Sequence, residues 1–329
     1  MVLILTRSDL EKTLSMRDTI MALEEAFKEQ TLGQVISPVR ISLTLQNKQG
    51  WFGIMPCYLK GLGRFSTKIV SLYGNNPIAH GLPTIMATVV LNDPDTGEVL
   101  SIMDGTYITA MRTGGLGGLA VKHLSRKDSQ MVGIFGAGVQ ARTQLMAIRE
   151  IREISLVKVY DPIVERAEKF RSEMQTQLRI PVKVVASPKQ LVKGSDIIIT
   201  VSTSKEPVLD GSDLENGIFV GAFGNFRPTE RELDSETVRR SRIVVDSREA
   251  ALEEAGDLLI PMKEGIITAD NIVADLGEVI LGRKTVRRDE TDIVLFKSVG
   301  LAIQDCAASA LAYQKARELG VGTEIELQQ

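Results

Sequence analysis

The sequence predicts an α/β protein in which a doubly wound parallel sheet is joined to an α+β domain with a mostly antiparallel sheet. Three observations support this fold class. The 329 residues exceed the roughly 150 residues of a typical domain. Short β-rich segments with turn residues fill much of the first third, whereas near-continuous apolar strands separated by helical segments follow, as in buried parallel sheets. We expect one domain from residues 1–118 with 302–329, and a second from 119–301.

The composition narrows the classes of function. Hydrophobic residues make up 43%, charged residues 25%, and the formal charge is −3, which is typical of a globular protein and unlike a nucleic-acid binder. The two cysteines and two histidines lack the spacing of zinc ligands, so no protein-held metal is expected. We interpret Cys57 and Cys306 as packed thiols in a reducing compartment. The short apolar run at the N-terminus predicts neither a signal peptide nor a membrane span, so a cytoplasmic protein is expected.

The first domain begins with a strand at residues 2–5, followed by an amphipathic helix from the capping residue Ser15 to Gly33. Several β-rich segments then predict an antiparallel sheet, with DPDTG as a hairpin turn. These segments are RISLTL, WFGIM, FSTKIVSLY, TIMATVVLN and EVLSIM.

Residues 106–124 return to helical spacing. Gly114, Gly115, Gly117 and Gly118 lower helix propensity, so they indicate close packing against another backbone or a cofactor. The parallel strands that follow are predicted at residues 131–135, 156–160, 182–185, 196–200, 218–222 and 242–246. A last helix, residues 299–319, is expected to end at Gly320 and to return to the first domain.

The segment GIFGAGVQAR contains the strongest motif. Gly136, Gly138 and Ala141 fit GxGxxG/A directly after a strand and at the start of a helix, which is the dinucleotide fingerprint of Rossmann-type sheets. The first glycine permits a tight turn, and the second lets backbone N–H groups approach a pyrophosphate. We therefore assign the cofactor-binding loop to Gly136, Ala137, Gly138, Val139 and Gln140.

Asp161 ends the next strand, 23 positions after Gly138, where an acidic residue accepts hydrogen bonds from the adenosine ribose. Its carboxylate would repel a 2′-phosphate, and no arginine immediately follows it, so NAD(H) is favoured over NADP(H). Ser202 and Thr203 follow another predicted strand. They line the dinucleotide or form an ordinary turn; the sequence supports both interpretations.

Three basic residues, Arg40, Lys68 and Arg112, stand out in the first domain. Long cationic side chains on strands usually lie at solvated edges. Arg112, however, lies in an apolar, glycine-rich segment where an unpaired guanidinium would be costly. We expect it to meet an anion, either the pyrophosphate or a substrate carboxylate.

Ordered blocks along nearly the whole chain resemble the ornithine cyclodeaminase/mu-crystallin family, which includes archaeal-type alanine dehydrogenases and ketimine reductases. These blocks are TKIVSLYGNNPIAHGLPT, VLNDPDTGEVLSIMDGTYITAMRTGG, GIFGAGVQAR, DIIITVSTS and FKSVGLAIQDCAASA.

The resemblance implies that Arg40, Lys68 and Arg112 bind a substrate carboxylate, with Lys68 also polarising the reacting centre. It implies that Thr113 reaches the pyrophosphate and that Ser298, Val299 and Gly300 approach the nicotinamide. It also implies a homodimer in which the first domain, completed by the last helix, binds substrate and supplies the interface sheet.

One block departs from the family pattern. Cyclodeaminases and related alanine dehydrogenases have a catalytic aspartate where this chain has Phe223, next to Ala222, in a segment assigned to the cofactor site. Residues 224–226 offer no carboxylate, and Glu230 and Glu232 are expected farther on, in a helix. Without that base, ammonia elimination lacks a proton acceptor, whereas reduction of a preformed imine needs chiefly a hydride and an oriented carboxylate.

The expected function is therefore NAD(H)-dependent reduction of an α-imino acid, such as Δ1-pyrroline-2-carboxylate or Δ1-piperideine-2-carboxylate, to the L-amino acid. The alternatives are an alanine or other amino-acid dehydrogenase, an ornithine cyclodeaminase with tightly bound NAD+, and a non-catalytic dinucleotide-dependent binding protein. The lone loop histidine His80 is a further candidate proton donor, or a structural residue.

Overall fold

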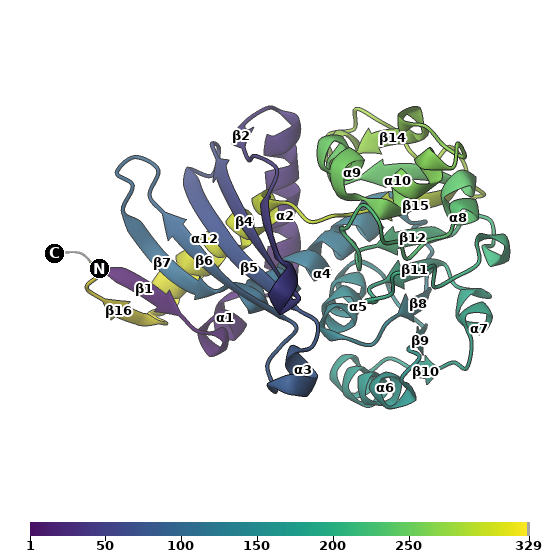
Figure 1. Ribbon diagram of the computed structural model, residues 1–329, viewed down its shortest axis with the longest axis horizontal. Coiled ribbons are helices and arrows are strands. Elements are labelled where there is room, and N and C mark those ends of the chain that lie inside the picture. The colour runs from purple at the N-terminus through teal and green to yellow at the C-terminus, as the bar shows by residue number, and fades with distance from the viewer. Residues whose placement is uncertain (328–329) are drawn as a thin grey trace. The chain divides into compact units, whose positions relative to one another are not determined.

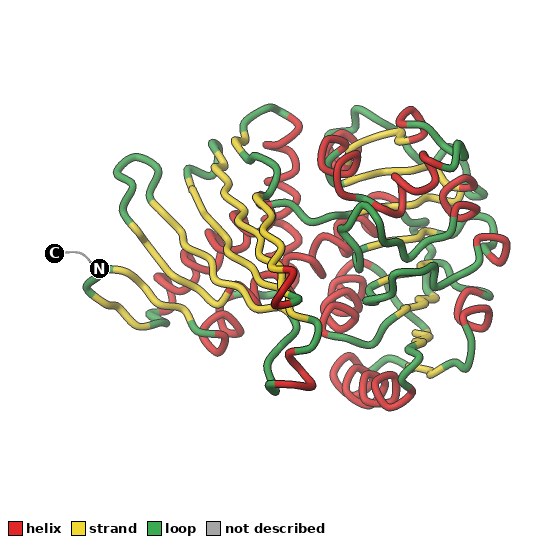
Figure 2. The backbone as a smooth tube through the Cα atoms, viewed as in Figure 1, coloured by secondary structure: helices red, strands yellow, loops and turns green. Residues whose placement is uncertain are grey.

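A computed structural model describes residues 1–327, and the chain forms two compact units. Unit 1 consists of Met1–Arg112 and the chain from Leu301 onward, and unit 2 of Thr113–Gly300. Each unit contains one sheet with its own helices (Figures 1 and 2). The predicted fold class, a parallel sheet plus a mostly antiparallel one, is confirmed.

The sheet of unit 1 has the order β16-β1-β7-β6-β5-β4-β2 in the described residues, with β3 also paired to β4. Neighbouring strands are antiparallel except β1 and β7. The strands are β1 (Val2–Leu5), β2 (Val35–Ile36), β3 (Ile41–Leu45), β4 (Gly50–Leu59), β5 (Arg64–Tyr73), β6 (Ile85–Asn92), β7 (Val99–Asp104) and β16 (Thr323–Ile325). The predicted hairpin turn joins β6 to β7, with Gly97 at φ 78°.

Helices cover one face of this sheet. They are α1 (Arg7–Thr13), α2 (Met16–Thr31) and α12 (Ala302–Leu319), whereas the short α3 (Asn76–Ala79) lies in the connection between β5 and β6. Ser15 caps α2 as predicted, because its Oγ accepts a hydrogen bond from the backbone N–H of Asp18 at 3.1 Å. Helix α12 packs against α2, β4 and β5 (Figure 1). The last helix thus returns to the first sheet, but it begins at Ala302 instead of Val299, because Gly300 has φ 79° and Leu301 is extended.

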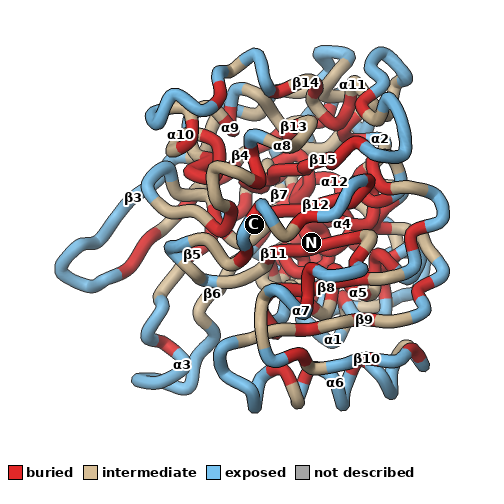
Figure 3. The backbone as a smooth tube through the Cα atoms, turned by 90° about the vertical axis from the view of Figure 1, so that its right-hand side faces the viewer, coloured by how far each residue is buried: buried red, intermediate tan, exposed pale blue. Residues whose placement is uncertain are grey.

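The two faces of the unit 1 sheet differ in burial. On β5, Ser66, Lys68 and Val70 are buried, and the two-residue period of a strand places them on the same face. Ile69 points to the opposite face and is exposed. Strand β3 is exposed along its whole length and stands out in pale blue in Figure 3.

Helix α4 (Gly105–Leu124) contains the four glycines whose close packing was predicted. A Cβ on Gly114 would lie 2.6 Å from the backbone of Thr143, and a Cβ on Gly117 would lie 1.7 Å from Oε1 of Gln144. Both contacts are with α5 (Val139–Ile151). The glycines therefore allow two helix backbones to approach, as expected.

The sheet of unit 2 is parallel throughout, in the order β10-β9-β8-β11-β12-β15-β13-β14 over the described residues. Its strands are β8 (Met131–Phe135), β9 (Leu156–Tyr160), β10 (Val182–Val184), β11 (Ile197–Thr200), β12 (Phe219–Ala222), β13 (Ser241–Val245), β14 (Ile272–Asp275) and β15 (Ile293–Lys297). Besides α5, its helices are α6 (Val164–Leu178), α7 (Pro188–Val192), α8 (Ser235–Arg240), α9 (Arg248–Glu254), α10 (Gly256–Lys263) and α11 (Leu276–Ile280). The chain order reverses between β8 and β11.

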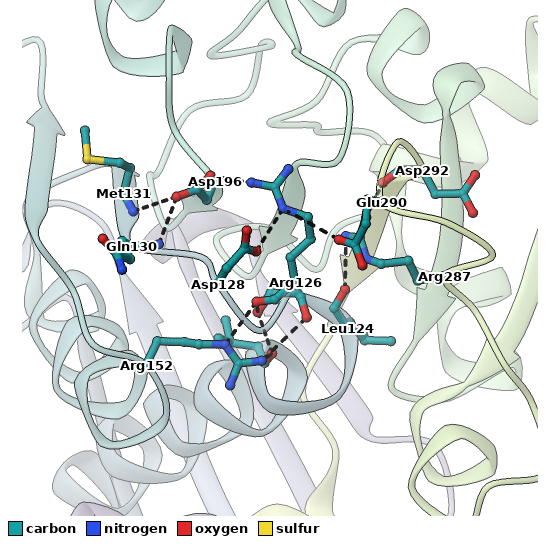
Figure 4. Close-up of polar contacts among 12 residues, drawn as sticks. Leu124, Arg126, Asp128, Gln130, Met131, Arg152, Asp196, Arg287, Glu290 and Asp292 are labelled. Carbon is teal, nitrogen blue, oxygen red and sulfur yellow. Dashed lines mark hydrogen bonds and ion pairs between the residues drawn. The ribbon is translucent and has the colours of Figure 1, made fainter.

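Arginine side chains satisfy the carbonyl groups at the C-terminal end of α4 (Figure 4). Arg152 donates hydrogen bonds to the carbonyls of Val121 and Arg126, at 3.1 Å each, and Arg287 donates to that of Leu124 at 3.2 Å. Cations at this end also complement the helix dipole. Arg126 in turn pairs with Asp196 at 2.7 Å, so the end of α4 is fixed to the start of β11.

Cys57 and Cys306 are both buried free thiols, as predicted. None of the helices in residues 1–327 combines the length and the apolar character needed to cross a membrane.

Candidate active site

The strand ends of unit 2 form one row at the carboxyl edge of the parallel sheet. Phe135 pairs in register with both Tyr160 and Thr200, Thr200 with Ala222, and Ala222 with Lys297. Except for Thr113, every predicted cofactor residue lies at one of these strand ends or in the segment that directly follows it. Ligands of open α/β sheets bind at this edge, where the strand order reverses.

The glycine loop after β8 has the geometry that a dinucleotide requires. Gly136 has φ 94°, and a Cβ there would lie 2.8 Å from the carbonyl oxygen of Val201, so the tight turn excludes a side chain. Gly138 faces open space, with nothing within 4 Å of an added Cβ. Helix α5 begins at Val139, followed by Gln140, and no side chain caps it. Its first N–H groups are thus suited to a phosphate.

Asp161 directly follows β9 and already supports this loop. Its Oδ2 accepts a hydrogen bond from the backbone N–H of Ala137 at 3.0 Å, and its Oδ1 accepts one from Ile163 at 2.9 Å. An ionised carboxylate has about four acceptor positions. Asp161 therefore keeps acceptor capacity for ribose hydroxyls while it fixes the glycine loop.

The expectation that Glu232 lies in a helix is wrong: residues 223–234 form a loop that returns Glu232 to the strand ends. Its carboxylate is fully buried and accepts hydrogen bonds from Thr200 Oγ1, Gly224 N, and both the N–H and the Oγ of Ser202, at 2.7 to 2.9 Å. Four donors compensate the loss of water. Burial raises the pKa of Glu232, and neighbouring Asp257 raises it further.

Glu230, in the same loop, is likewise not helical, and its carboxylate pairs with Arg227 at 3.1 Å. Thr203 is exposed, whereas the Ser202 hydroxyl is directed at Glu232. Of the two hydroxyls in this turn, Thr203 is therefore the one turned toward solvent.

A buried ion pair stabilises the centre of the same edge. Lys297 Nζ lies 2.6 Å from Asp257 Oδ2, and both side chains are fully buried. Lys297 also donates to the carbonyl of Asn225 at 2.5 Å, and Asp257 Oδ1 accepts from the backbone N–H groups of Glu232 and Leu233. This pair joins the end of β15 to the Glu232 loop.

Asp246, which follows β13, holds the segment expected at the nicotinamide. Its Oδ2 accepts hydrogen bonds from Ser298 Oγ at 2.7 Å, Val299 N at 3.0 Å and Gly300 N at 2.9 Å. Burial raises the pKa of Asp246. Because one carboxylate oxygen gathers all three residues, this segment has a defined conformation.

Phe223 places an aromatic ring where the family aspartate was expected. Its ring packs on Phe296 with 5.7 Å between centroids. Ala222 is fully buried at the end of β12. Thr113 is buried, and its carbonyl accepts a hydrogen bond from Gln144 Nε2 at 3.0 Å, which ties α4 to α5.

In unit 1, Lys68 and Arg112 meet at a shared carboxylate that the sequence interpretation did not identify. Lys68 Nζ lies 2.6 Å from Asp305 Oδ2, and Arg112 Nε lies 3.0 Å from Asp305 Oδ1. Arg112 Nη1 also donates to Gln304 Oε1. All four side chains are buried, and the two from α12 are fully so. The anion expected beside Arg112 is thus, in part, a residue of the chain itself.

Burial shifts the protonation of this cluster. Loss of water lowers the pKa of Lys68 to about 7, with the charges of Arg112 and Arg40 acting in the same direction and Asp305 opposing them. When Lys68 is protonated, Lys68 and Arg112 together carry two positive charges beside the single negative charge of Asp305. Such an excess attracts an anion, most simply a ligand carboxylate.

The roles of four residues at the site were not predicted from the sequence. Asp246 follows a predicted strand directly, so its position after RIVV was a usable signal. Gln304 and Asp305 lie in an alanine-rich helix, and once such a helix is buried its polar side chains need hydrogen-bond partners. Glu232 had no local signal, because only the loop path returns it to Ser202.

Comparison with known proteins identifies the family. The family model for ornithine cyclodeaminase/mu-crystallin matches residues 2–320. Δ1-Pyrroline-2-carboxylate reductase of Bacillus cereus is 36% identical over 326 residues, covering 99% of this chain and 100% of that protein. Ketimine reductase mu-crystallin of Macropus fuliginosus is also 36% identical, covering 94% and 96%.

Solved structures agree with these sequence relatives. The Thermococcus litoralis Δ1-pyrroline-2-carboxylate reductase, in complex with NADH and L-proline, has a TM-score of 0.96 at 47% identity and covers 98% of this chain and 100% of that one. An archaeal alanine dehydrogenase dimer with bound NAD has a TM-score of 0.94 at 37% identity, covering 99% of both chains. The chain therefore belongs to the ornithine cyclodeaminase/mu-crystallin family, as the resemblance predicted.

Proposed function

We propose that this protein is an NAD(H)-dependent reductase that converts a cyclic α-imino acid, such as Δ1-pyrroline-2-carboxylate or Δ1-piperideine-2-carboxylate, to the L-amino acid. The observation that carries the proposal is the buried excess of positive charge around Lys68 and Arg112. Relatives that cover nearly the whole chain are reductases of such imines. Phe223 supports reduction over elimination, since it provides no proton acceptor.

The roles follow from the chemistry of each side chain. Arg112 and Arg40 bind the substrate carboxylate, and the Asp305 contact keeps the Arg112 guanidinium in a fixed orientation. Burial has lowered the pKa of Lys68 to about 7, so the protonated Nζ releases its proton readily near neutral pH and supplies it to the imine nitrogen. A bound nicotinamide supplies the hydride. The buried cluster keeps water away from the reacting carbon.

The dinucleotide is held by the carboxyl edge of the unit 2 sheet. The N–H groups of the glycine loop and the start of α5 bind the pyrophosphate, with Thr113 adjoining, and Asp161 accepts hydrogen bonds from the ribose. Ser202 and Thr203, Ala222 and Phe223, and Ser298 to Gly300 line the remainder. The Asp161 carboxylate supports NAD(H) over NADP(H), because it repels a 2′-phosphate.

A homodimer is supported by the open face of the unit 1 sheet. Ile41 pairs with Ile54, and Ile54 pairs with Ile69, so three isoleucines lie side by side on one face. Ile41 and Ile69 are exposed, as is Leu43, which shares the face of Ile41. Such an exposed apolar patch marks an interface, and an archaeal relative is described as a dimer. We expect the I41K/I69K variant to be a monomer by size-exclusion chromatography with light scattering.

The buried free thiols of Cys57 and Cys306 support a location of this protein in a reducing compartment, such as the cytoplasm.

Nicotinamide absorbance tests the function. We expect NADH oxidation with Δ1-pyrroline-2-carboxylate alone, and slower oxidation with NADPH. Oxidation only with pyruvate plus ammonia would identify an alanine dehydrogenase instead. Formation of proline and ammonia from ornithine without net NADH would identify a cyclodeaminase, and cofactor binding without turnover on the whole panel would indicate a binding protein.

A further inference from the structure

The first turn of α12 presents two consecutive buried polar residues to the same arginine. Arg112 donates from Nε to Asp305 Oδ1 at 3.0 Å and from Nη1 to Gln304 Oε1. Both acceptors are fully buried. A guanidinium has only donors, so the atom of the Gln304 amide that faces Arg112 must be its oxygen. The orientation of this amide is therefore determined by its partner.

The nitrogen of the same amide carries two N–H donors, and neither has an acceptor among the described residues. In residues 1–327, Gln304 Nε2 is buried and makes no hydrogen bond. A buried donor without a partner is costly, and buried polar groups nearly always have one. The arrangement therefore calls for an acceptor that arrives from outside the chain.

The charges nearby determine which acceptor fits. The basic side chains of Lys68 and Arg112 outweigh the single charge of Asp305. An anionic acceptor gains from this excess, whereas a neutral one does not. We propose that Gln304 is a further substrate-binding residue, whose Nε2 donates a hydrogen bond to the carboxylate of the α-imino acid. This inference rests on the proposed function, which supplies the carboxylate.

Asp305 and Gln304 then have separate tasks. Asp305 can only accept hydrogen bonds, so it orients the cations but would repel a substrate carboxylate. Gln304 holds Arg112 with its oxygen and keeps two donors for the ligand. A glutamate at position 304 would keep the contact with Arg112, remove the donors and cancel positive charge.

This difference gives a discriminating experiment. Q304E should raise the KM for Δ1-pyrroline-2-carboxylate about 30-fold or more, the loss expected when a charge-assisted hydrogen bond is replaced by repulsion. The Kd for NADH should change less than about twofold. Q314E is the matched control, because Gln314 is an exposed glutamine of the same helix whose amide donates to Glu318; its KM should equal that of the wild type. A wild-type KM in Q304E would overturn the inference.

Two additions keep the test decisive. If Q304E does not fold, Q304M, which also lacks the donors but adds no charge, should raise KM about 10-fold. Calorimetry with L-proline and with L-prolinamide separates this inference from the proposed function. If Q304E or Q304M loses affinity for L-proline but not for L-prolinamide, the result supports the carboxylate contact even if the wild type reduces no imine. Equal losses for both ligands, or no binding of L-proline to the wild type, would overturn it.

Discussion

Lys68 Nζ and Asp305 Oδ2 lie 2.6 Å apart with both side chains buried, although the two residues come from a central strand and the last helix. Because Arg112 contacts the other oxygen of the same carboxylate, Asp305 fixes both cations relative to each other. This contact explains how a lysine can be buried in a sheet and still carry a proton.

The pH profile of the wild type should reflect Lys68. Its pKa is lowered to about 7 by burial, and Asp305 opposes that shift. Since the protonated lysine is the active form in this account, kcat/KM should fall as the pH rises through about 7. In D305N the opposing charge is gone, so the falling limb should move to lower pH by about one unit or more. An unchanged limb in D305N would show that another group titrates.

Removal of the Lys68 amine should reduce turnover without loss of cofactor binding. We expect K68M to lower kcat/KM about 10²-fold or more, the usual contribution of a positioned proton donor. The Kd for NADH, from nucleotide fluorescence, should stay within about twofold. K60M, at an exposed lysine of the same unit, should behave as the wild type. Full turnover by K68M would remove Lys68 from the mechanism.

Two glycine-to-alanine variants should have opposite effects. G138A adds a Cβ where nothing lies within 4 Å, so the thermal midpoint of unfolding should stay unchanged. The Kd for NADH should rise about 10-fold or more, because the added Cβ conflicts with the pyrophosphate. G114A places a Cβ 2.6 Å from the Thr143 backbone and should lower the thermal midpoint by several degrees, as overpacking does. Thermal denaturation and cofactor titration distinguish them, and unchanged NADH affinity in G138A would contradict the assigned loop.

Selectivity between cofactors should depend on the charge of Asp161. D161N keeps one acceptor oxygen, enough for one of the two backbone N–H groups of Ala137 and Ile163, and loses the repulsion of a 2′-phosphate. The ratio of kcat/KM for NADH to that for NADPH should fall about 10-fold. Steady-state kinetics with both cofactors measures this ratio, and no change in it would mean that other residues select the cofactor.

Glu232 should be essential for the stability of the strand-end loops. E232Q replaces one carboxylate oxygen with an amide N–H₂, which then faces either the two donors of Ser202 or those of Thr200 and Gly224. This conflict should destabilise unit 2 by about 2 kcal/mol or more. Urea titration measures the loss. E230Q serves as control, because Glu230 makes ion pairs nearer the surface; its effect should be within about 0.5 kcal/mol. Similar effects for both variants would contradict a special role for Glu232.

Local patterns predicted most elements and the glycine loop, because apolar strands, caps and turn residues act over short distances. Strand β15 was missed as a strand, although its Lys297 forms a buried ion pair with Asp257. Asp305 and Glu232 could not be placed, since their partners are remote in sequence and depend on how the last helix and one loop return to their sheets. The start of α12 was predicted three residues early, because the positive φ of Gly300 is visible only in the structure.

The most direct measurement is the fate of deuterium from NADH labelled at both C4 positions, incubated with Δ1-pyrroline-2-carboxylate and no ammonia. We expect L-proline that carries one deuterium at Cα, formed in equal amount to the NADH consumed, as measured by mass spectrometry and chiral chromatography. Absence of labelled proline, with NADH still bound by the protein, would contradict the assignment of this protein as an imine reductase.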